Sequence, residues 1–321
     1  MSSAEPVPET RDMSGDDLAA EDAYRALRRY GRWALVRDAF LRFRYGDGFS
    51  HARAFAFQLC LAVVPFLIAF LGLVSDLGAD NGGKVLGDTV LAITPGSSVS
   101  LVRQLLQDDH GEVALTLGLL TGLVALTTAM AQIERGANRI YGVERDRPSV
   151  AKYTRATILM LVAGLPALFG FLLLVAGRPF GDAAERHWGW EGEMRVAWDF
   201  IRWPLSLVLT VIAVGLLFRY GPRRHQPGLS WLLFGAVVAT MLWWLASVLL
   251  AGYVRFSGQF GATYGPLTAV MALLLWANLT GLALFIGVAF AAQLEAKRVG
   301  VRRPAKQDAW KPARQVSGRG R

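Results

Sequence analysis

The chain has 321 residues, 53% of them hydrophobic, and its mean hydropathy is +0.35. This composition excludes an ordinary soluble domain, and the single cysteine, Cys60, excludes a disulfide within one chain. The net charge is +9, from 34 basic and 25 acidic residues, and the basic residues concentrate beside long apolar runs. We therefore expect anionic lipid headgroups at the cytoplasmic face, and no nucleic acid, as partners of the basic surface.

The N-terminal part of the chain is polar and changes character part-way along. Residues 1–21 are acidic, contain Pro and Ser, and are expected to be disordered. Residues 22–50 place Trp33, Phe40 and Phe43 on one arc of a helix, with arginines around them. This pattern predicts an amphipathic juxtamembrane helix on the inner leaflet. An ordinary cytoplasmic helix packed on the rest of the protein is the alternative.

Six long apolar runs follow and predict an all-α transmembrane domain over residues 51–297. Most runs are about 20 residues long, which is the length that a helix needs to cross about 30 Å of hydrocarbon. In the second run Gly118 and Gly122 form a Gly-x-x-x-Gly pair, which predicts the close approach of a neighbouring helix. The six runs occupy residues 54–74, 113–133, 157–177, 204–218, 231–251 and 267–291.

The basic residues that flank the runs set the expected topology. Alternate flanking segments carry 27 lysines and arginines in one set and 7 in the other. The positive-inside rule places the richer set in the cytoplasm. We therefore predict a polytopic membrane protein with six transmembrane helices and both termini cytoplasmic. Residues 298–321 are expected to be a basic, disordered tail near the inner leaflet.

Two of the segments expected outside are long. Residues 75–112 are rich in glycine and acidic residues, and a short helix is expected near 84–93 or 98–107. Residues 178–203 contain four tryptophans, which favour the level of the lipid headgroups and predict part of an outer aromatic belt.

Polar side chains inside or beside the apolar runs are the candidate functional residues, because a polar group in a membrane needs a partner. Four of them share one face of the second run at spacings of 7, 4 and 3 residues. The pattern indicates a polar cavity that a substrate could follow, with interhelical hydrogen bonds as the alternative interpretation. The substrate-pathway candidates are Gln58, Thr121, Thr128, Gln132, Arg135, Asn138, Arg139 and Asn278.

Signals for soluble catalysis are missing from the sequence. The four histidines lie tens of residues apart, and there is no His-x-x-x-His pair, Cys-x-x-Cys pair, nucleophile elbow or P-loop. Asp108, Asp109, His110 and Glu112 could hold a divalent cation, although a solvated acidic loop is the expected reading. We therefore expect no enzyme activity, no catalytic residues, no metal site and no cofactor.

Three stretches together resemble the YihY/BrkB family of bacterial inner-membrane proteins. They are AFAFQLCLAVVPFLIAFLGL at 54–73, ANRIYGVERDRP at 137–148 and YGPLTAVMALLLWANLTGLALFIGVAFAAQLEA at 264–296. The resemblance runs from about residue 35 to 298. It implies a multi-pass protein of the bacterial plasma (inner) membrane with six helices. It also implies links to envelope integrity and to export of lipid-like molecules.

The chain departs from the family pattern in its last helix. Family members often carry an acidic residue in a Gly-Ala-Glu stretch, whereas this chain has Gly287-Val288-Ala289. A proton-coupled mechanism that relies on that acid is therefore not expected. The old ribonuclease BN label of some members is not expected to apply either, because the chain lacks the His-x-His-x-Asp-His cluster of metal-dependent ribonucleases.

The sequence leads to two functional hypotheses of different classes. The first is a protein that exports or flips an amphipathic or lipid-linked anion, with Arg139 at the end of the second run binding the anionic group through its planar fork. The second is a membrane scaffold that transports nothing and supports the envelope through partners. A homo-oligomer is possible under either hypothesis.

Overall fold

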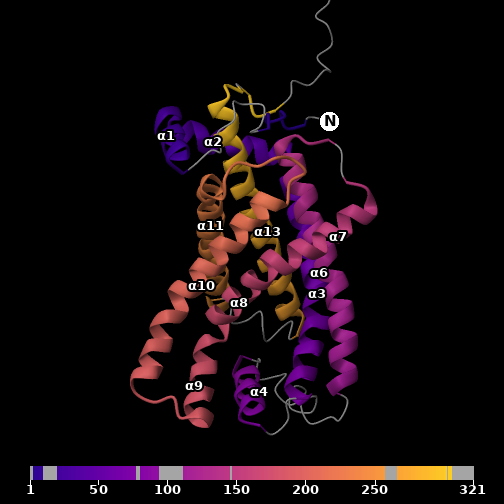
Figure 1. Cartoon of the computed structure of the whole chain (residues 1–321), viewed down its shortest axis with the longest axis vertical. Coiled ribbons are helices and arrows are strands. Elements are labelled where there is room, and N and C mark those ends of the chain that lie inside the picture. The colour runs from indigo at the N-terminus through magenta and orange to yellow at the C-terminus, as the bar shows by residue number, and fades with distance from the viewer. Residues whose placement is uncertain are drawn as a thin grey trace, which may run out of the picture.

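The computed structural model describes residues 3–9, 20–76, 80–93, 111–144, 147–256, 266–301 and 303–305, and the fold is a bundle of long helices (Figure 1). Within these described residues, six helical segments are long and apolar enough to cross a membrane, which confirms the predicted number. The residues near both chain ends lie at the same end of the bundle as the connections 142–148 and 221–228. We call this the basic end and the opposite one the far end.

Two helices, not one, form the amphipathic N-terminal segment. Helix α1 spans Ala20–Tyr30 and α2 spans Arg32–Tyr45, and the break falls at Gly31, which has a φ of 76°. A positive φ is easy only for glycine, so the helix ends there. Trp33 and Phe40 are exposed on α2, whereas Phe43 is buried against Phe49. The expected apolar arc is therefore divided between the surface and the core.

Helices α3 (Gly48–Asp76) and α6 (Gly111–Tyr141) have the most extensive contact of the helix pairs that the structure describes. A Cβ atom on Gly118 would lie 2.6 Å from the backbone nitrogen of Ala69 and 2.7 Å from the carbonyl oxygen of Pro65. Only glycine permits this approach, so the close contact predicted from the Gly-x-x-x-Gly pair is present. Pro65 lies inside α3 without ending it.

The third span changes its helical geometry half-way. It begins as α7 (Ser149–Leu159), widens into a π-helical turn, η3 (Met160–Gly164), and continues as α8 (Leu165–Val175). Pro166 has no N–H and its ring clashes with a carbonyl four residues earlier. A π turn just before the proline accommodates both effects.

The last three spans complete the bundle. Helix α9 (Gly177–Trp188) leads at the far end into α10 (Glu193–Tyr220), which begins well before the apolar run expected at 204–218. Helices α11 (Leu229–Phe256) and α13 (Pro266–Arg298) then pack together. A Cβ atom on Gly287 would lie 2.6 Å from Cβ of Ala239, so the stretch that lacks the family's acid is a tight helix contact.

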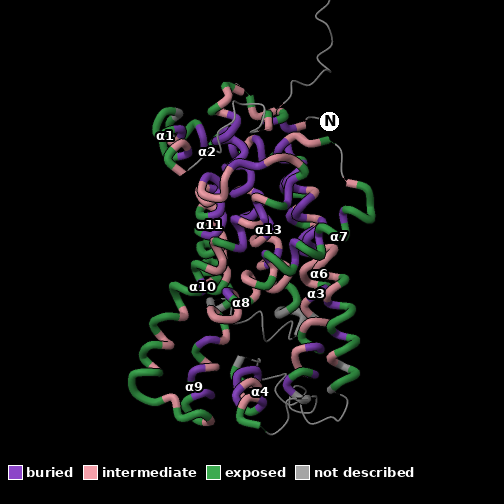
Figure 2. The backbone as a smooth tube through the Cα atoms, in the orientation of Figure 1, coloured by how far each residue is buried: buried purple, intermediate pink, exposed green. Residues whose placement is uncertain are grey.

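The buried core lies in the half of the bundle toward the basic end. Figure 2 shows buried backbone concentrated there, while the helices of the far half are mostly exposed or half-buried. The surface of the six spans is apolar, as a lipid-facing surface must be. The short helix α4 (Asn81–Ile93) lies at the far end, near the first of the two positions expected for a helix in that loop. The second position, 98–107, falls outside the described residues.

Candidate functional site

Buried ion pairs tie the helices together at the basic end. Arg224, in the connection between α10 and α11, forms two hydrogen bonds to Glu295 on α13, at 2.7 and 2.9 Å. The two side chains are 1% and 0% exposed. Burial works against the charge of Arg224, but the bonds to Glu295 outweigh it and raise the pKa of Arg224 above its ordinary value. This pair fixes the end of α13 to the α10–α11 connection.

Two further pairs close the same end. Arg147 Nη1 lies 3.1 Å from Glu134 Oε2 and also donates to the carbonyl oxygen of Gly221, while Nη2 donates to that of Pro222. Burial lowers the pKa of Arg147, and Glu134 acts in the opposite direction. Lys297 Nζ lies 2.7 Å from Asp38 Oδ2 and joins α13 to α2. Ion pairs and hydrogen bonds at this end therefore connect α2, α6, α10 and α13.

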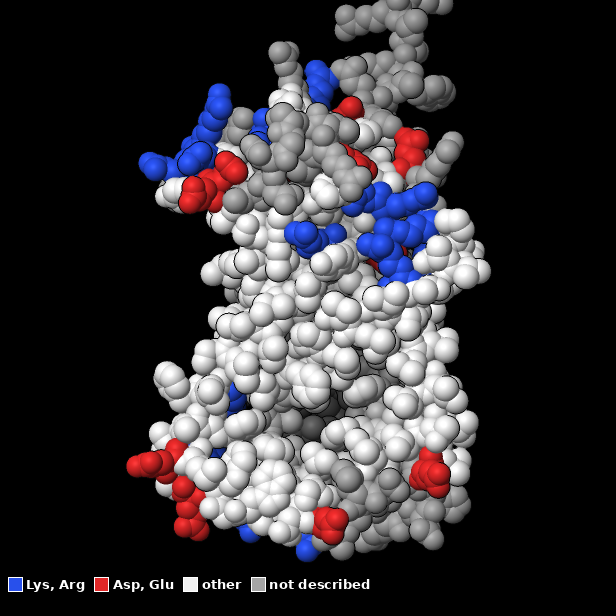
Figure 3. All heavy atoms as spheres, in the orientation of Figure 1, with Lys and Arg blue, Asp and Glu red and all other residues white. Residues whose placement is uncertain are grey.

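The adjacent candidates Asn138 and Arg139 have opposite environments. Asn138 is buried, and its Oδ1 accepts a 2.6 Å hydrogen bond from the backbone N–H of Arg223. Arg139 is exposed on the next position of α6. Figure 3 shows Lys and Arg gathered on the surface around this connection between α6 and α7. Asn138 thus holds the fold together, while Arg139 can meet an external anion.

The polar face expected along α6 is divided by the structure. Thr128 donates a 2.9 Å hydrogen bond to Gln58 Oε1 on α3, so these two candidates meet. Thr121 is exposed and bonds only to carbonyl oxygens of its own helix, at Leu117 and Gly118. Gln132 and Arg135, nearer the basic end, are half-buried. The shared face therefore does not form one continuous lining.

Asn278 lies apart from these residues, on α13. Its side chain is half-buried, and its Oδ1 is buried without a hydrogen-bond partner. Near it along the helix, Thr280 accepts a 3.2 Å bond from Trp243 Nε1, and Trp276 Nε1 donates to Ser247 Oγ at 3.2 Å. The middle of the bundle thus holds several polar groups from α11 and α13, and one of them, Asn278, has an unused acceptor.

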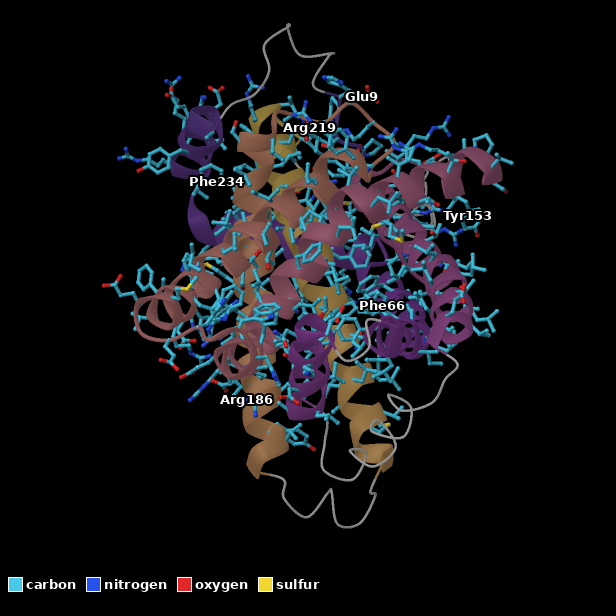
Figure 4. All side chains as sticks on the ribbon, turned by 60° about the horizontal axis from the view of Figure 1, so that its bottom comes forward. Glu9, Phe66, Tyr153, Arg186, Arg219 and Phe234 are labelled. Atoms are coloured by element: carbon cyan, nitrogen blue, oxygen red, sulfur yellow. The ribbon has the colours of Figure 1, made fainter. Side chains whose placement is uncertain are left out.

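The far half of the bundle carries a depression on one face. Figure 3 shows this depression between the levels of α8 and α4. With the far end turned forward, Figure 4 shows α4 in front of the bundle, close to α9, on which Arg186 is labelled. Asp88 of α4 holds it there, because its Oδ2 lies 3.0 Å from His187 Nε2 and 3.2 Å from Arg186 Nη2. Charge therefore attaches α4 at the edge of this depression.

The tryptophans expected in an outer belt form a cluster at the far end. Trp188, Trp190 and Trp198 surround Phe180, with ring centroids 5.3–6.1 Å from it. Trp203 instead lies beside Trp244 of α11, at 6.0 Å. The first three rings thus hold α9 against the start of α10.

Sequence reasoning missed the buried partners at the basic end, among them Arg42, Arg224, Gln293 and Glu295. A signal for Glu295 was present, because an acid at the end of an apolar helix needs a cation and marks a partner. No group of three His, Cys, Asp or Glu side chains that could hold a metal occurs among the described residues. Asp108, Asp109 and His110 lie outside that part of the chain.

Comparison with known proteins identifies the family. The family model for virulence factor BrkB matches residues 39–312, which includes all six spans. The chain belongs to the BrkB family. This membership and the six spans agree with a multi-pass protein of the bacterial inner membrane. No solved structure matches the chain.

Curated relatives of this BrkB-family chain carry two kinds of name. The ribonuclease-like protein YfkH of Bacillus subtilis is 28% identical, over 83% of this chain and 96% of its own length. A UPF0761 membrane protein of Chromohalobacter salexigens is 27% identical, over 89% and 69%. Another from Azoarcus sp. is 29% identical over 80% of this chain, which spans only 64% of that relative. Two of the three names thus describe a membrane protein and give no activity.

Proposed function

We propose that this BrkB-family protein moves an amphipathic or lipid-linked anion across the bacterial inner membrane and so supports the envelope. The observation that carries the proposal is the asymmetry of the bundle. Buried and partly buried ion pairs close the basic end, whereas one face of the far half carries a depression (Figure 3). A carrier that opens alternately to the two sides has this form in one of its states.

The charge distribution favours an anionic substrate that enters from the basic end. The positive-inside rule assigns this end to the cytoplasm. There the exposed Arg139 stands beside the closed end, and its planar fork suits a phosphate oxygen pair. An anionic headgroup held at Arg139 would lie next to the ion pairs that must open for passage.

Polar groups deeper in the bundle support the same route. Gln58 and Thr128 meet between α3 and α6, and Asn278 keeps an acceptor without a partner on α13. Such groups in a membrane interior can accept hydrogen bonds from a headgroup that passes between helices. The family's acid is replaced in this chain, so the route proposed here uses neutral polar side chains.

The scaffold alternative rests on one specific observation. The hydrogen bond between Thr128 and Gln58 satisfies both groups, as helix packing alone would require. A scaffold needs no passage, so substitution of the exposed Arg139 should leave its role intact. Ribonuclease activity is not proposed, because the described residues offer no metal-binding cluster.

The test compares transbilayer movement of labelled phosphatidylglycerol in proteoliposomes of the wild-type protein, Arg139→Ala and Arg139→Lys. Loss of movement in Arg139→Ala with partial retention in Arg139→Lys supports an anion contact at this position, since lysine keeps the charge but not the fork. Arg28→Ala, which removes an exposed arginine from α1, is the control for loss of charge alone. Equal rates in all four proteins would contradict the assignment of Arg139.

A further inference from the structure

The first described segment of the chain crosses the basic end as an extended strap. We call residues 3–9 the N-terminal strap. Ala4 pairs with Ala305 in an antiparallel bridge, Glu5 N–H donates to Pro304 O at 3.0 Å, and Val7 N–H donates to Tyr141 O at 3.1 Å. Ala4 and Val7 are buried. The strap therefore belongs to the folded structure and covers what lies beneath it.

Two arginines lie under the N-terminal strap and bind its backbone. Arg42 Nη1 donates a 2.7 Å hydrogen bond to the carbonyl oxygen of Glu5. Arg224 Nη2 donates one of the same length to the carbonyl oxygen of Pro8, and its guanidinium stacks 4.6 Å from the ring centroid of Tyr141. The strap thus presents oxygen atoms to two cations at once.

Of the two arginines, only Arg224 forms an ion pair among the described residues. Glu295 pairs with Arg224, whereas the other contacts of Arg42 are Gln293 Oε1 at 2.7 Å and the carbonyl oxygen of Ile140 at 3.2 Å. Arg42 is 0% exposed, and its Nη2 has no hydrogen-bond partner among the residues that the structure describes. Burial lowers the pKa of Arg42 to about 10, while the nearby Tyr141, Glu5 and Glu295 act in the opposite direction without forming an ion pair with it.

We propose that the N-terminal strap occupies an anion-binding site formed by Arg42 and Arg224, and that a phosphate-bearing anion displaces the strap to bind there. The carbonyl oxygens of Glu5 and Pro8 stand in for phosphate oxygens, which guanidinium groups bind more strongly than neutral acceptors. Arg42 Nη2 and Arg224 Nε, which have no hydrogen-bond partner in the described part of the chain, supply further donors.

The N-terminal strap is held by a discontinuous set of backbone hydrogen bonds. Pro6 and Pro8 have no N–H, so the strap cannot form a continuous ladder with its neighbours. Gly142 has a φ of 78°, and a Cβ atom there would lie 2.6 Å from Cα of Pro6, so the strap lies directly on this backbone. It also precedes residues 39–312, which match the family model and contain both arginines. The two arginines therefore lie within the region that matches the family model, whereas the strap lies outside it.

The test measures binding of inorganic pyrophosphate by calorimetry to the full chain in neutral detergent. A reversible lock uses Ala4→Cys with Ala305→Cys in a Cys60→Ala background, because residues paired in this way are close enough for a disulfide. The proposal expects pyrophosphate to bind the reduced protein at least tenfold more tightly than the oxidised one. Equal binding, or none in either form, would overturn it.

Deletion of residues 3–9 gives a second measurement. It should tighten pyrophosphate binding by about tenfold or more, and adding Arg42→Gln to the deletion should abolish the gain. Adding Arg37→Gln instead, which removes an exposed arginine from the same helix, should not. If Arg37→Gln weakens binding as much as Arg42→Gln does, the site is wrong. If the variant that lacks residues 3–9 does not fold, the comparison of the reduced and oxidised disulfide variant tests the proposal.

A second arm separates a soluble phosphate from a lipid headgroup. Binding to vesicles of phosphatidylglycerol in phosphatidylcholine is measured with the lock reduced and oxidised. If the lock changes only pyrophosphate binding, the ligand is a soluble anion. If it changes vesicle binding too, the ligand is a lipid headgroup. If the lock changes neither vesicle binding nor pyrophosphate binding, the proposed site is contradicted. None of these readouts depends on transport.

Discussion

Arg224 and Glu295 form a doubly hydrogen-bonded ion pair across 71 residues of sequence, with side chains 1% and 0% exposed. Neither charge can reach water, so each depends on the other for its place in the fold. The pair joins the α10–α11 connection to the last turns of α13, beside the closed basic end. It is the most deeply buried of the three ion pairs at that end.

Arg224→Met should therefore destabilise the protein strongly. It leaves Glu295 buried without its cation, and breaking such a pair costs about 3–5 kcal/mol. Thermal unfolding in detergent measures the loss. Arg37→Ala, which breaks a pair whose arginine is 74% exposed, should cost about 1 kcal/mol or less. Equal melting temperatures for the two variants would show that the buried pair contributes no more than a surface one.

Gly118→Leu should separate α3 from α6. The added side chain would overlap the backbone of Ala69 and Pro65, and neither can move without shifting a helix. Overpacking of this kind costs about 1–3 kcal/mol. Gly252→Leu is the matched control, because none of the described residues lies within 4 Å of a Cβ atom on Gly252. The yield of folded protein after detergent extraction should fall for the first variant and stay near wild type for the second.

Thr128→Val and Thr121→Val compare a hydroxyl that bonds to another helix with one that bonds only within α6. Both changes remove a hydroxyl from α6, but only Thr128 bonds to another helix, through Gln58. Translocation of labelled phosphatidylglycerol should fall several-fold in Thr128→Val and stay unchanged in Thr121→Val. A cost of about 0.6–1.7 kcal/mol in stability is expected for Thr128→Val from the lost bond alone. Parallel loss of stability and rate in this variant, restored together at lower temperature, would favour a packing role.

Asp88→Ala should loosen α4 without opening the basic end. The substitution removes the contacts to Arg186 and His187 that hold α4 on α9. The carboxylate is partly exposed, so the effect is local and small in global stability. Hydrogen–deuterium exchange should increase in residues 81–93 and remain unchanged at 138–144. Unchanged exchange in α4 would mean that its other contacts suffice to hold it.

The spans and their closest contact could be predicted from sequence because both depend on local composition. Runs of about 20 apolar residues must be helical in a membrane, and Gly118 predicts a close neighbour wherever that neighbour comes from. The break at Gly31 was also visible in principle, since glycine favours a positive φ. The spans thus needed no knowledge of the tertiary fold.

The candidate site depended on contacts that local patterns do not encode. Thr121 and Thr128 share one face of α6, yet one is exposed and the other bonds to α3, because the neighbours of α6 change along its length. The partner of Arg224 lies 71 residues away, and Arg42 meets Gln293 from 251 residues away. Charges were visible in the sequence, but their pairing was not.

The most direct measurement is the rate at which the wild-type protein moves labelled phosphatidylglycerol between leaflets of proteoliposomes, with labelled phosphatidylcholine measured beside it. Transport of an anionic amphiphile predicts a phosphatidylglycerol rate well above that of empty liposomes and above the phosphatidylcholine rate. Rates equal to those of empty liposomes for both lipids would contradict movement of a phospholipid and favour the scaffold.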